Sequence, residues 1–195
     1  MIITDTPEHD HNGGRPGVGR FRNSGAGGRA WPHLEHGPGI DPYAGLEPQR
    51  TVDPTPKPGV LDFRDLVLAE FPETSNGGIS RSGDRGGQSE HKEGRAWDWR
   101  VRSVTQVQLV EALFDWLFAT DRYGNAHALA RRWGLMYVIY DRRIWGAYLA
   151  DEGWRPYAGV DPHVDHVHFS FSWAGAMRRT SWWEAVASAS TDTPY

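Results

Sequence analysis

Four stretches of the chain predict helices. In the longest of them, apolar residues recur at helical spacing, which is typical of a helix with one face against a core; these are Val107, Val110, Leu113, Phe114, Leu117 and Phe118. Ser103 and Gln106 form a plausible capping box before the longest stretch, and Pro72 ends the first one. The predicted helices are residues 61–71, 107–118, 125–133 and 180–188.

A second pattern, in which apolar and polar residues alternate or short apolar runs occur, predicts β-strands. Such stretches are bounded by glycine, proline and aspartate, as strands usually are. Asp141 and Arg142 separate two of them by so short a connection that a hairpin is expected. The predicted strands are residues 94–101, 135–140, 142–148 and 166–171.

Helices early and in the middle of the chain, with strands around them, indicate an α+β fold. We expect a small antiparallel sheet flanked by helices. Residues 1–59 are rich in glycine and proline and predict an irregular arm, whereas residues 60–195 predict one folded domain. The arm could dock on the domain through Trp31 and Tyr43.

Composition excludes several classes of function. The 195-residue chain has a formal net charge of −4, so it lacks the basic field that nucleic-acid binding needs. It contains no cysteine, which excludes disulfides, thiolate metal sites and cysteine nucleophiles. Neither a signal peptide nor a membrane-spanning stretch is recognisable. We therefore expect a monomer made in the cytoplasm, with no nucleic-acid partner and no membrane insertion.

Three histidines lie within six residues at the start of the last predicted strand. Residues two apart share one face of a strand, so His166 and His168 point the same way while Val167 and Phe169 point into the core. His163 lies where the preceding loop joins the strand and could turn toward the same side. Neutral imidazole is a common zinc ligand, although an exposed polar strand would also explain the His-x-His pair.

A second segment could complete a metal site. His91 lies in a glycine-rich loop, Asp98 follows on the next strand, and Gly94 lets the chain bend between them. Either residue alone is more simply a loop histidine or an exposed carboxylate. Two histidines and an aspartate with one open position form a catalytic rather than a structural zinc site, because structural sites are closed by four protein ligands.

Residues 89–98, SEHKEGRAWD, fit the pattern Ser-x-His-x-x-Gly-x-Ala-x-Asp, and a His-x-His follows at 166–168. The chain thereby resembles the zinc D-Ala-D-Ala carboxypeptidases and murein endopeptidases, the LAS-type metallopeptidases. Residues 137–145, 153–159 and 165–176 look like the actinobacterial and actinophage branch of that family. The resemblance covers roughly residues 60–182 and implies a LAS- or hedgehog-like fold.

The resemblance implies one zinc ion, held by His91, Asp98 and His168. Many members carry a glutamate as general base three residues before the first histidine of His-x-His. Here that position is His163, as in the penicillin-insensitive murein endopeptidases. His163 would then be the base, since an imidazole exchanges protons near neutral pH. His166 could stabilise the oxyanion of the reaction.

Further residues are candidates for substrate contacts. Arg81 occupies a place where the family often has an arginine that could pair with a peptide carboxylate, and Arg85 competes for that role. Ser89 is expected to hydrogen-bond within the site rather than to act as a nucleophile. Trp154 and Tyr157 would line the substrate groove or pack beneath a loop.

Two further carboxylates lie near the histidines in the sequence. Asp165 should point away from His166, so that a surface position is the simpler interpretation for it and for Asp161. A role as partner of an active-site histidine stays open for both.

The sequence thus predicts a zinc metallopeptidase that hydrolyses peptide bonds of peptidoglycan. A D-alanyl-diaminopimelate endopeptidase is favoured over an L-alanyl-D-glutamate endopeptidase or a D-Ala-D-Ala carboxypeptidase. Such an enzyme would be a phage endolysin or another lytic enzyme that acts at the bacterial cell wall after release. The alternative is an inactive, zinc-containing module that binds peptidoglycan within a larger assembly.

Overall fold

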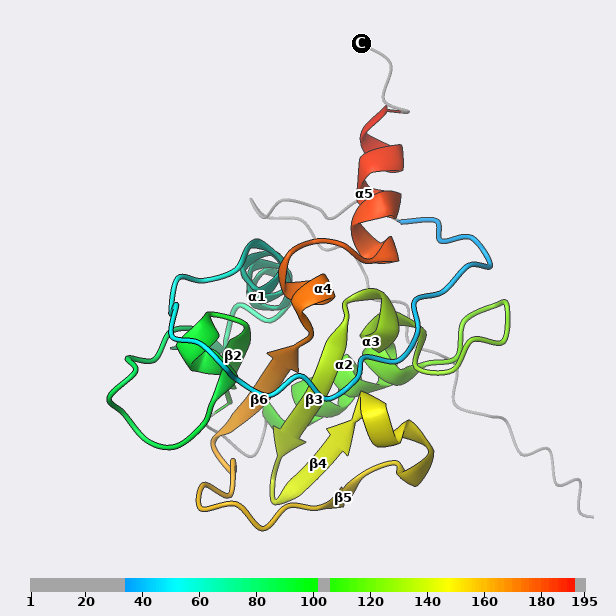
Figure 1. Ribbon diagram of the computed structural model, residues 1–195. Coiled ribbons are helices and arrows are strands. Elements are labelled where there is room, and N and C mark those ends of the chain that lie inside the picture. The colour runs from blue at the N-terminus through cyan, green and yellow to red at the C-terminus, as the bar shows by residue number, and fades with distance from the viewer. Residues whose placement is uncertain (1–33, 102–105, 192–195) are drawn as a thin grey trace, which may run out of the picture. The chain divides into compact units, whose positions relative to one another are not determined.

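The computed structural model describes residues 34–101 and 106–191 (Figure 1). Outside these residues lie Trp31, Ser103 of the predicted capping box, and three histidines of residues 1–59, namely His9, His11 and His33. The helices are α1 (Pro58–Glu70), η1 (Glu90–Glu93), α2 (Val107–Phe118), α3 (Ala128–Arg132), η3 (Ala147–Glu152), α4 (Trp173–Ala176) and α5 (Ser181–Thr191). The strands are β1 (Ser75–Gly78), β2 (Ala96–Arg100), β3 (Leu135–Tyr140), β4 (Arg143–Gly146), β5 (Arg155–Pro156) and β6 (His166–Phe171).

One six-stranded sheet organises the described residues. Its strand order is β1-β2-β6-β3-β4-β5, and every neighbouring pair is antiparallel. The last strand in sequence, β6, therefore lies between β2 and β3 near the middle of the sheet (Figure 1). The expected α+β class with an antiparallel sheet and helices is confirmed.

One face of the sheet carries the aromatic core. Trp97 on β2 and Phe169 on β6 are fully buried, as the alternation of each strand predicts. Phe63 of α1 lies against both rings, with centroid distances of 6.0 and 5.0 Å. These edge-to-face contacts fix α1 on this face. The residues that alternate with these aromatic side chains, Asp98 on β2 and His168 on β6, therefore point to the opposite face of the sheet.

The β3–β4 hairpin forms through Asp141 and Arg142, as predicted. The two residues have φ angles of 42° and 59°, and Tyr140 pairs directly with Arg143. Positive φ at both central positions is typical of a type I′ turn, which matches the twist of the flanking strands.

Several elements differ from the sequence prediction. Helix α3 covers only Ala128–Arg132, so it is shorter than the predicted 125–133. Strand β1 lies within a stretch expected to be a glycine-rich loop, because Ser-Asn-Gly-Gly has no apolar alternation. It forms by pairing with β2, and Asn76 accepts a 2.9 Å hydrogen bond from the indole of Trp97. Tertiary contact, not intrinsic preference, makes this strand.

Residues 34–57 contain no helix or strand, yet side chains hold them to the domain. The Glu93 carboxylate accepts hydrogen bonds from the backbone N–H groups of Arg50 and Thr51 at 2.9 Å, and from Arg95 Nε at 2.8 Å. The Tyr43 hydroxyl lies 2.9 Å from the His127 ring. Burying the Arg95 charge completely would be costly without a carboxylate partner, and Glu93 is that partner. Because Glu93 also accepts the hydrogen bonds from residues 50 and 51, it fixes residues 34–57 against the turn that follows η1.

No helix in the described part of the chain combines the length and the apolar character that crossing a membrane requires.

Gly94 is expected to be intolerant of any side chain. Its φ is +62°, and a Cβ there would lie 2.0 Å from the carbonyl oxygen of Thr55. Gly86 has a φ of +63° but open space around it, so it is a matched control. Gly86→Ala should lower the free energy of unfolding by about 1–2 kcal/mol through backbone strain alone. Gly94→Ala should cost a further 1–3 kcal/mol or so from the clash.

Urea unfolding in the presence of a chelator measures both changes without a contribution from bound metal. Equal losses of stability in the two variants would contradict the close packing of Thr55 on Gly94.

Candidate metal centre

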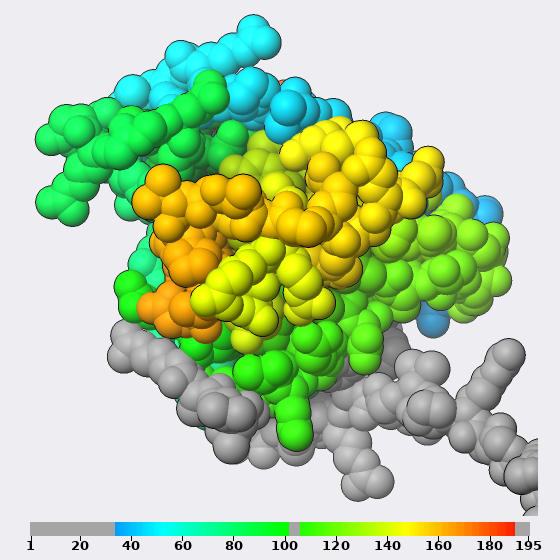
Figure 2. Space-filling model, turned by 90° about the horizontal axis from the view of Figure 1, so that it is seen from below, coloured from blue at the N-terminus to red at the C-terminus, as the bar shows by residue number. Residues whose placement is uncertain are grey.

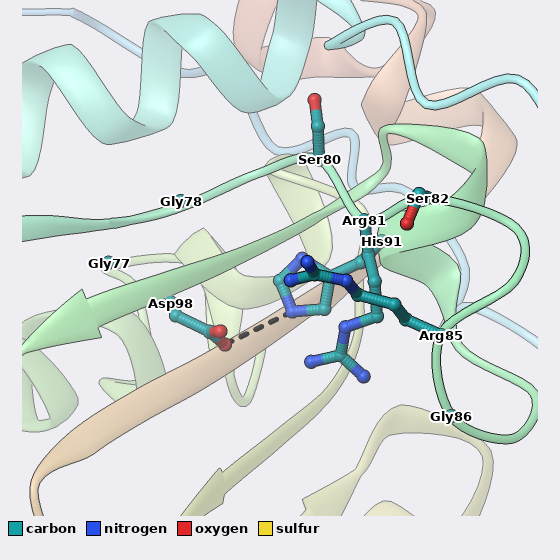
Figure 3. Close-up of a pocket in the computed structure, with 9 residues that line it drawn as sticks. All are labelled: Gly77, Gly78, Ser80, Arg81, Ser82, Arg85, Gly86, His91 and Asp98. Atoms are coloured by element: carbon teal, nitrogen blue, oxygen red, sulfur yellow. Dashed lines mark hydrogen bonds and ion pairs between the residues drawn. The ribbon is translucent and has the colours of Figure 1, made fainter.

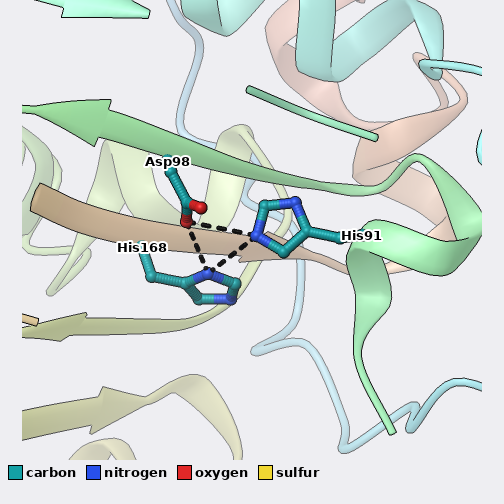
Figure 4. A group of neighbouring side chains, drawn as sticks. All are labelled: His91, Asp98 and His168. Carbon is teal, nitrogen blue, oxygen red and sulfur yellow. Dashed lines mark hydrogen bonds and ion pairs between the residues drawn. The ribbon is translucent and has the colours of Figure 1, made fainter. Parts of the chain in front are cut away.

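Two neighbouring strands bring the first two candidate ligands together. Asp98 on β2 pairs directly with His168 on β6, so both side chains leave the same face of the sheet. His168 Nδ1 lies 3.0 Å from Asp98 Oδ1, and His91 Nε2 lies 3.1 Å from the same oxygen (Figure 4). The two ring nitrogens are 3.2 Å apart. We call His91, Asp98 and His168 the metal triad.

The short helix η1 positions His91. Gly94 follows the helix in the left-handed region and turns the chain directly into β2, which places His91 beside Asp98. The His91 carbonyl accepts a 3.1 Å hydrogen bond from the backbone N–H of Arg81, and its ring Nδ1 donates to the carbonyl of Ile79 at 2.7 Å. A backbone acceptor of this kind fixes both the ring orientation and the tautomer of a metal-binding histidine.

The tautomer of His91 creates an electrostatic conflict within the metal triad. Because a carbonyl oxygen only accepts, the contact with Ile79 places a proton on Nδ1. Nε2 of the neutral ring then carries a lone pair, yet it faces the Asp98 carboxylate, another acceptor, at 3.1 Å. A positive charge between these atoms removes the conflict. His91 is only 3% exposed, so a bound cation does this at less cost than a buried imidazolium.

The electrostatics of the other two ligands agree with this arrangement. Burial alone would raise the pKa of Asp98, but the adjacent imidazoles of His168 and His91 hold it well below its usual value, so the carboxylate is ionised. Burial lowers the pKa of His168. An ionised carboxylate and two neutral imidazoles are the protonation states in which these side chains bind a divalent cation.

His163 lies beside the metal triad on a tight turn. Its φ is +51°, and its backbone N–H donates to Asp161 Oδ1 at 3.0 Å. Its ring Nδ1 donates to the carbonyl of Asp161 at 2.7 Å, so the lone pair of the neutral ring is on Nε2. The ring centroid is 5.6 Å from that of His168. Burial, followed by the proximity of His168, lowers the pKa of His163 to about 4.

The prediction that Asp165 points away from His166 is wrong. Asp165 Oδ1 lies 2.7 Å from His166 Nδ1, so the two side chains are hydrogen-bonded although strand alternation separates them. Asp165 directly precedes β6, and its carbonyl accepts a 3.1 Å hydrogen bond from the backbone N–H of Val101, so the backbone pairing continues here while the side chain bends back to its neighbour. The pair turns His166 Nε2 toward the metal triad, 3.8 Å from Asp98 Oδ1.

A pocket of about 340 Å³ opens beside two of the three triad residues. Arg81 and Arg85 both line it, together with His91 and Asp98, and Figure 3 shows the two guanidinium groups directed into it. Lys92 Nζ donates to the carbonyls of Gly83 and Gly86 at 2.9 and 3.2 Å, which holds the loop that carries Arg85. Both candidate arginines therefore face the site.

The remaining candidates lie in different places. Tyr157 contacts the edge of the His163 ring at a centroid distance of 5.4 Å. Trp154 lies against Phe114 at 5.0 Å and lines a separate pocket with it. Ser89 directly precedes η1, and its backbone N–H donates to the side chain of Gln49 at 3.1 Å.

Sequence reasoning missed a buried pair behind the metal triad. The Tyr137 ring stacks on His168, with centroids 5.5 Å and planes 20° apart, and its hydroxyl donates to the Glu90 carboxylate. Burial and the neighbouring Glu90 raise the pKa of Tyr137 well above its usual value, so the hydroxyl stays protonated. The position of Glu90 next to His91 was visible in the sequence, but the partner strand of β6 was not.

The fold and the site together define an α+β protein with two histidines and one aspartate converging at a common point. A family model described as VldE, C-terminal domain, matches residues 53–168, more than half of the chain, and the chain belongs to that family. The matched stretch includes all three residues of the metal triad. Neither the curated proteins nor the solved structures gave a match.

Loss of one triad ligand should abolish tight metal binding. We expect His168→Ala and His91→Ala to weaken the binding of Zn²⁺ by more than about 100-fold, since even removal of an outer-shell partner costs 10- to 100-fold. Isothermal titration of the full chain measures this. His127→Gln is the control, because His127 contacts Tyr43 and is not part of the metal triad. A background that carries His9→Ala, His11→Ala and His33→Ala removes other imidazoles of the N-terminal stretch.

The metal-free protein should lose stability as the pH falls from about 6.5 toward 4. In this window unfolded His163 binds a proton that the folded ring, with its pKa of about 4, does not. Stability is therefore fully present above 6.5 and decreases on acidification. His163→Gln should flatten this part of the pH profile in chelator-treated samples. An unchanged slope of unfolding free energy against pH would contradict the buried, neutral state of His163.

Proposed function

We propose that this protein is a zinc-dependent peptidase whose site is the metal triad. The observation that carries the proposal is the convergence of His91, Asp98 and His168, with two acceptor atoms facing one another at 3.1 Å in a buried place. Two histidines and one carboxylate suit zinc in sites with an open position. The complete Ser-x-His-x-x-Gly-x-Ala-x-Asp motif supplies two of these ligands and supports a LAS-type metallopeptidase.

The metal triad would hold zinc through His91 Nε2, His168 Nδ1 and a carboxylate oxygen of Asp98. When bound, zinc supplies a Lewis acid that polarises a carbonyl and lowers the pKa of water. The remaining steps fall to the side chains around it. Tyr137, stacked on His168, and the Ile79 carbonyl on His91 keep the two imidazoles in the orientation that the ligand set requires.

His163 would be the general base. Its Nδ1 is engaged by the Asp161 carbonyl, so the proton of the attacking water would be taken at Nε2 and passed from there to the leaving amine. The low pKa keeps this nitrogen free of a proton at neutral pH. The neighbouring His166 would donate from Nε2 to the developing oxyanion once its ring has taken up a second proton, and the carboxylate of Asp165 at Nδ1 would then balance that charge.

Arg81 and Arg85 would bind a carboxylate of the substrate. A planar guanidinium matches a carboxylate in two hydrogen bonds, and both arginines border the same pocket as His91 and Asp98. Stem peptides of peptidoglycan carry such carboxylates on their D-amino acids. Tyr157, at the edge of His163, is placed to contact the peptide on the other side.

The substrate class comes from the family resemblance. The His-x-x-His-x-His run favours cleavage of the D-alanyl-diaminopimelate cross-link over cleavage of an L-alanyl-D-glutamate or D-Ala-D-Ala bond. The protein would then be a phage endolysin or another lytic enzyme that reaches the bacterial cell wall after its release.

A peptidoglycan-binding module that holds zinc without turnover is the second candidate. The observation that favours it is that His163 stands where many members of the resembled family carry the glutamate that serves as general base. The two candidates share the metal and the substrate, and differ in hydrolysis alone.

Zinc-loaded full-length protein should release free amino groups from diaminopimelate-type peptidoglycan, and a chelator should stop the release. His163→Ala should retain zinc and lose about 100-fold or more of the hydrolysis rate, the usual contribution of a general base. His127→Gln should keep its activity. Mass spectrometry of the released fragments identifies the bond.

Three results separate the alternatives. Binding to peptidoglycan with no fragments released would establish the binding module. Full activity of His163→Ala would remove His163 as the base. Hydrolysis that persists in chelator and in His168→Ala would contradict the zinc peptidase altogether.

A further inference from the structure

A second cluster of metal-binding side chains adjoins the metal triad. Asp161, His163 and His166 each offer a ligand atom, and these atoms all lie within 4.8 Å of one another. None of the three belongs to the metal triad. The turn that carries them, orange in Figure 2, lies on the same face of the molecule as the arginine-bearing loop, drawn in green.

Hydrogen bonds on the far side of both rings prepare this cluster for a cation. His163 Nδ1 is engaged by the Asp161 carbonyl and His166 Nδ1 by the Asp165 carboxylate, each at 2.7 Å. Both Nε2 atoms are therefore left with lone pairs, and the ring centroids are 4.7 Å apart. A carbonyl or carboxylate on the outer nitrogen is the arrangement that orients histidine ligands in metal sites.

The Asp161 carboxylate completes the cluster. One oxygen, Oδ1, accepts the backbone N–H of His163 at 3.0 Å and fixes the left-handed turn. This leaves the second oxygen for a cation, and the side chain is exposed to solvent. Two imidazoles and one carboxylate, with room for water, are a donor set suited to zinc.

We propose that Asp161, His163 and His166 form a second zinc site beside the metal triad, weaker because it is more exposed. His166 Nε2 lies 3.8 Å from Asp98 Oδ1, so the two sites share a boundary. A second ion would occupy the nitrogen atoms that peptide hydrolysis requires. Excess zinc therefore inhibits the enzyme, and this part of the inference rests on the proposed function, whereas the binding of the ion does not.

The test is a zinc titration of the full-length chain in the His9→Ala, His11→Ala, His33→Ala background. Calorimetry and metal analysis should give two ions per chain, one tight and one weaker. Asp161→Asn should lower the affinity of the weaker site at least tenfold, because an amide keeps the Oδ1 acceptor for His163 but loses the charge. His163→Ala should also abolish binding of the weaker ion. Asp151→Asn, at an exposed position in η3, is the matched control and should keep both ions.

The first ion serves as an internal reference. It should persist in Asp161→Asn and His163→Ala and disappear in His168→Ala. A single ion in the background protein, or a second ion unaffected by both Asp161→Asn and His163→Ala, overturns the second site. Failure of the proposed peptidase gives a different result, namely no peptidoglycan hydrolysis at one equivalent of zinc.

Inhibition is measured separately. If the protein hydrolyses peptidoglycan, the rate should fall as zinc exceeds one equivalent, and Asp161→Asn should need at least tenfold more zinc for the same fractional loss. Equal inhibition of the Asp161→Asn variant and its parent would show that the inhibitory ion binds elsewhere, and would overturn that half of the inference.

Discussion

The pairing of β2 with β6 is the constraint on which the site depends. It joins segments about 70 residues apart in the chain and sets Asp98 directly opposite His168. A one-residue slip of either strand would turn all its side chains to the other face. Trp97 or Phe169 would then leave the core, and Asp98 or His168 would leave the triad. The burial of those two aromatic rings therefore enforces the geometry of the candidate metal triad.

The parts of the fold that could be predicted are those in which local pattern and tertiary structure agree. Helices α1 and α2, the β3–β4 hairpin, and the faces of β2 and β6 follow from the spacing of apolar residues. Strand β1 could not be predicted in this way, since Ser-Asn-Gly-Gly becomes a strand only through β2 and through the Asn76–Trp97 hydrogen bond.

The candidate site shows the same division. The triad was visible because its spacing follows strand alternation and a motif. The contacts around it were not, because they depend on the order of strands: Tyr137 meets His168 only since β3 lies next to β6. Asp165 was misjudged because alternation fixes only the direction in which a side chain leaves the backbone, whereas the Asp165 carboxylate bends back to the ring of its neighbour His166.

Lys92 links the arginine-bearing loop to His91 of the metal triad, so that the two move together. It follows His91 directly in η1 and its ammonium grips two carbonyls of the loop around residues 83–86. A displacement of that loop would therefore also displace η1, the helical turn that positions the His91 imidazole. An anion bound between the two arginines and a cation bound at the metal triad would attract one another, and each would raise the affinity for the other by the same factor.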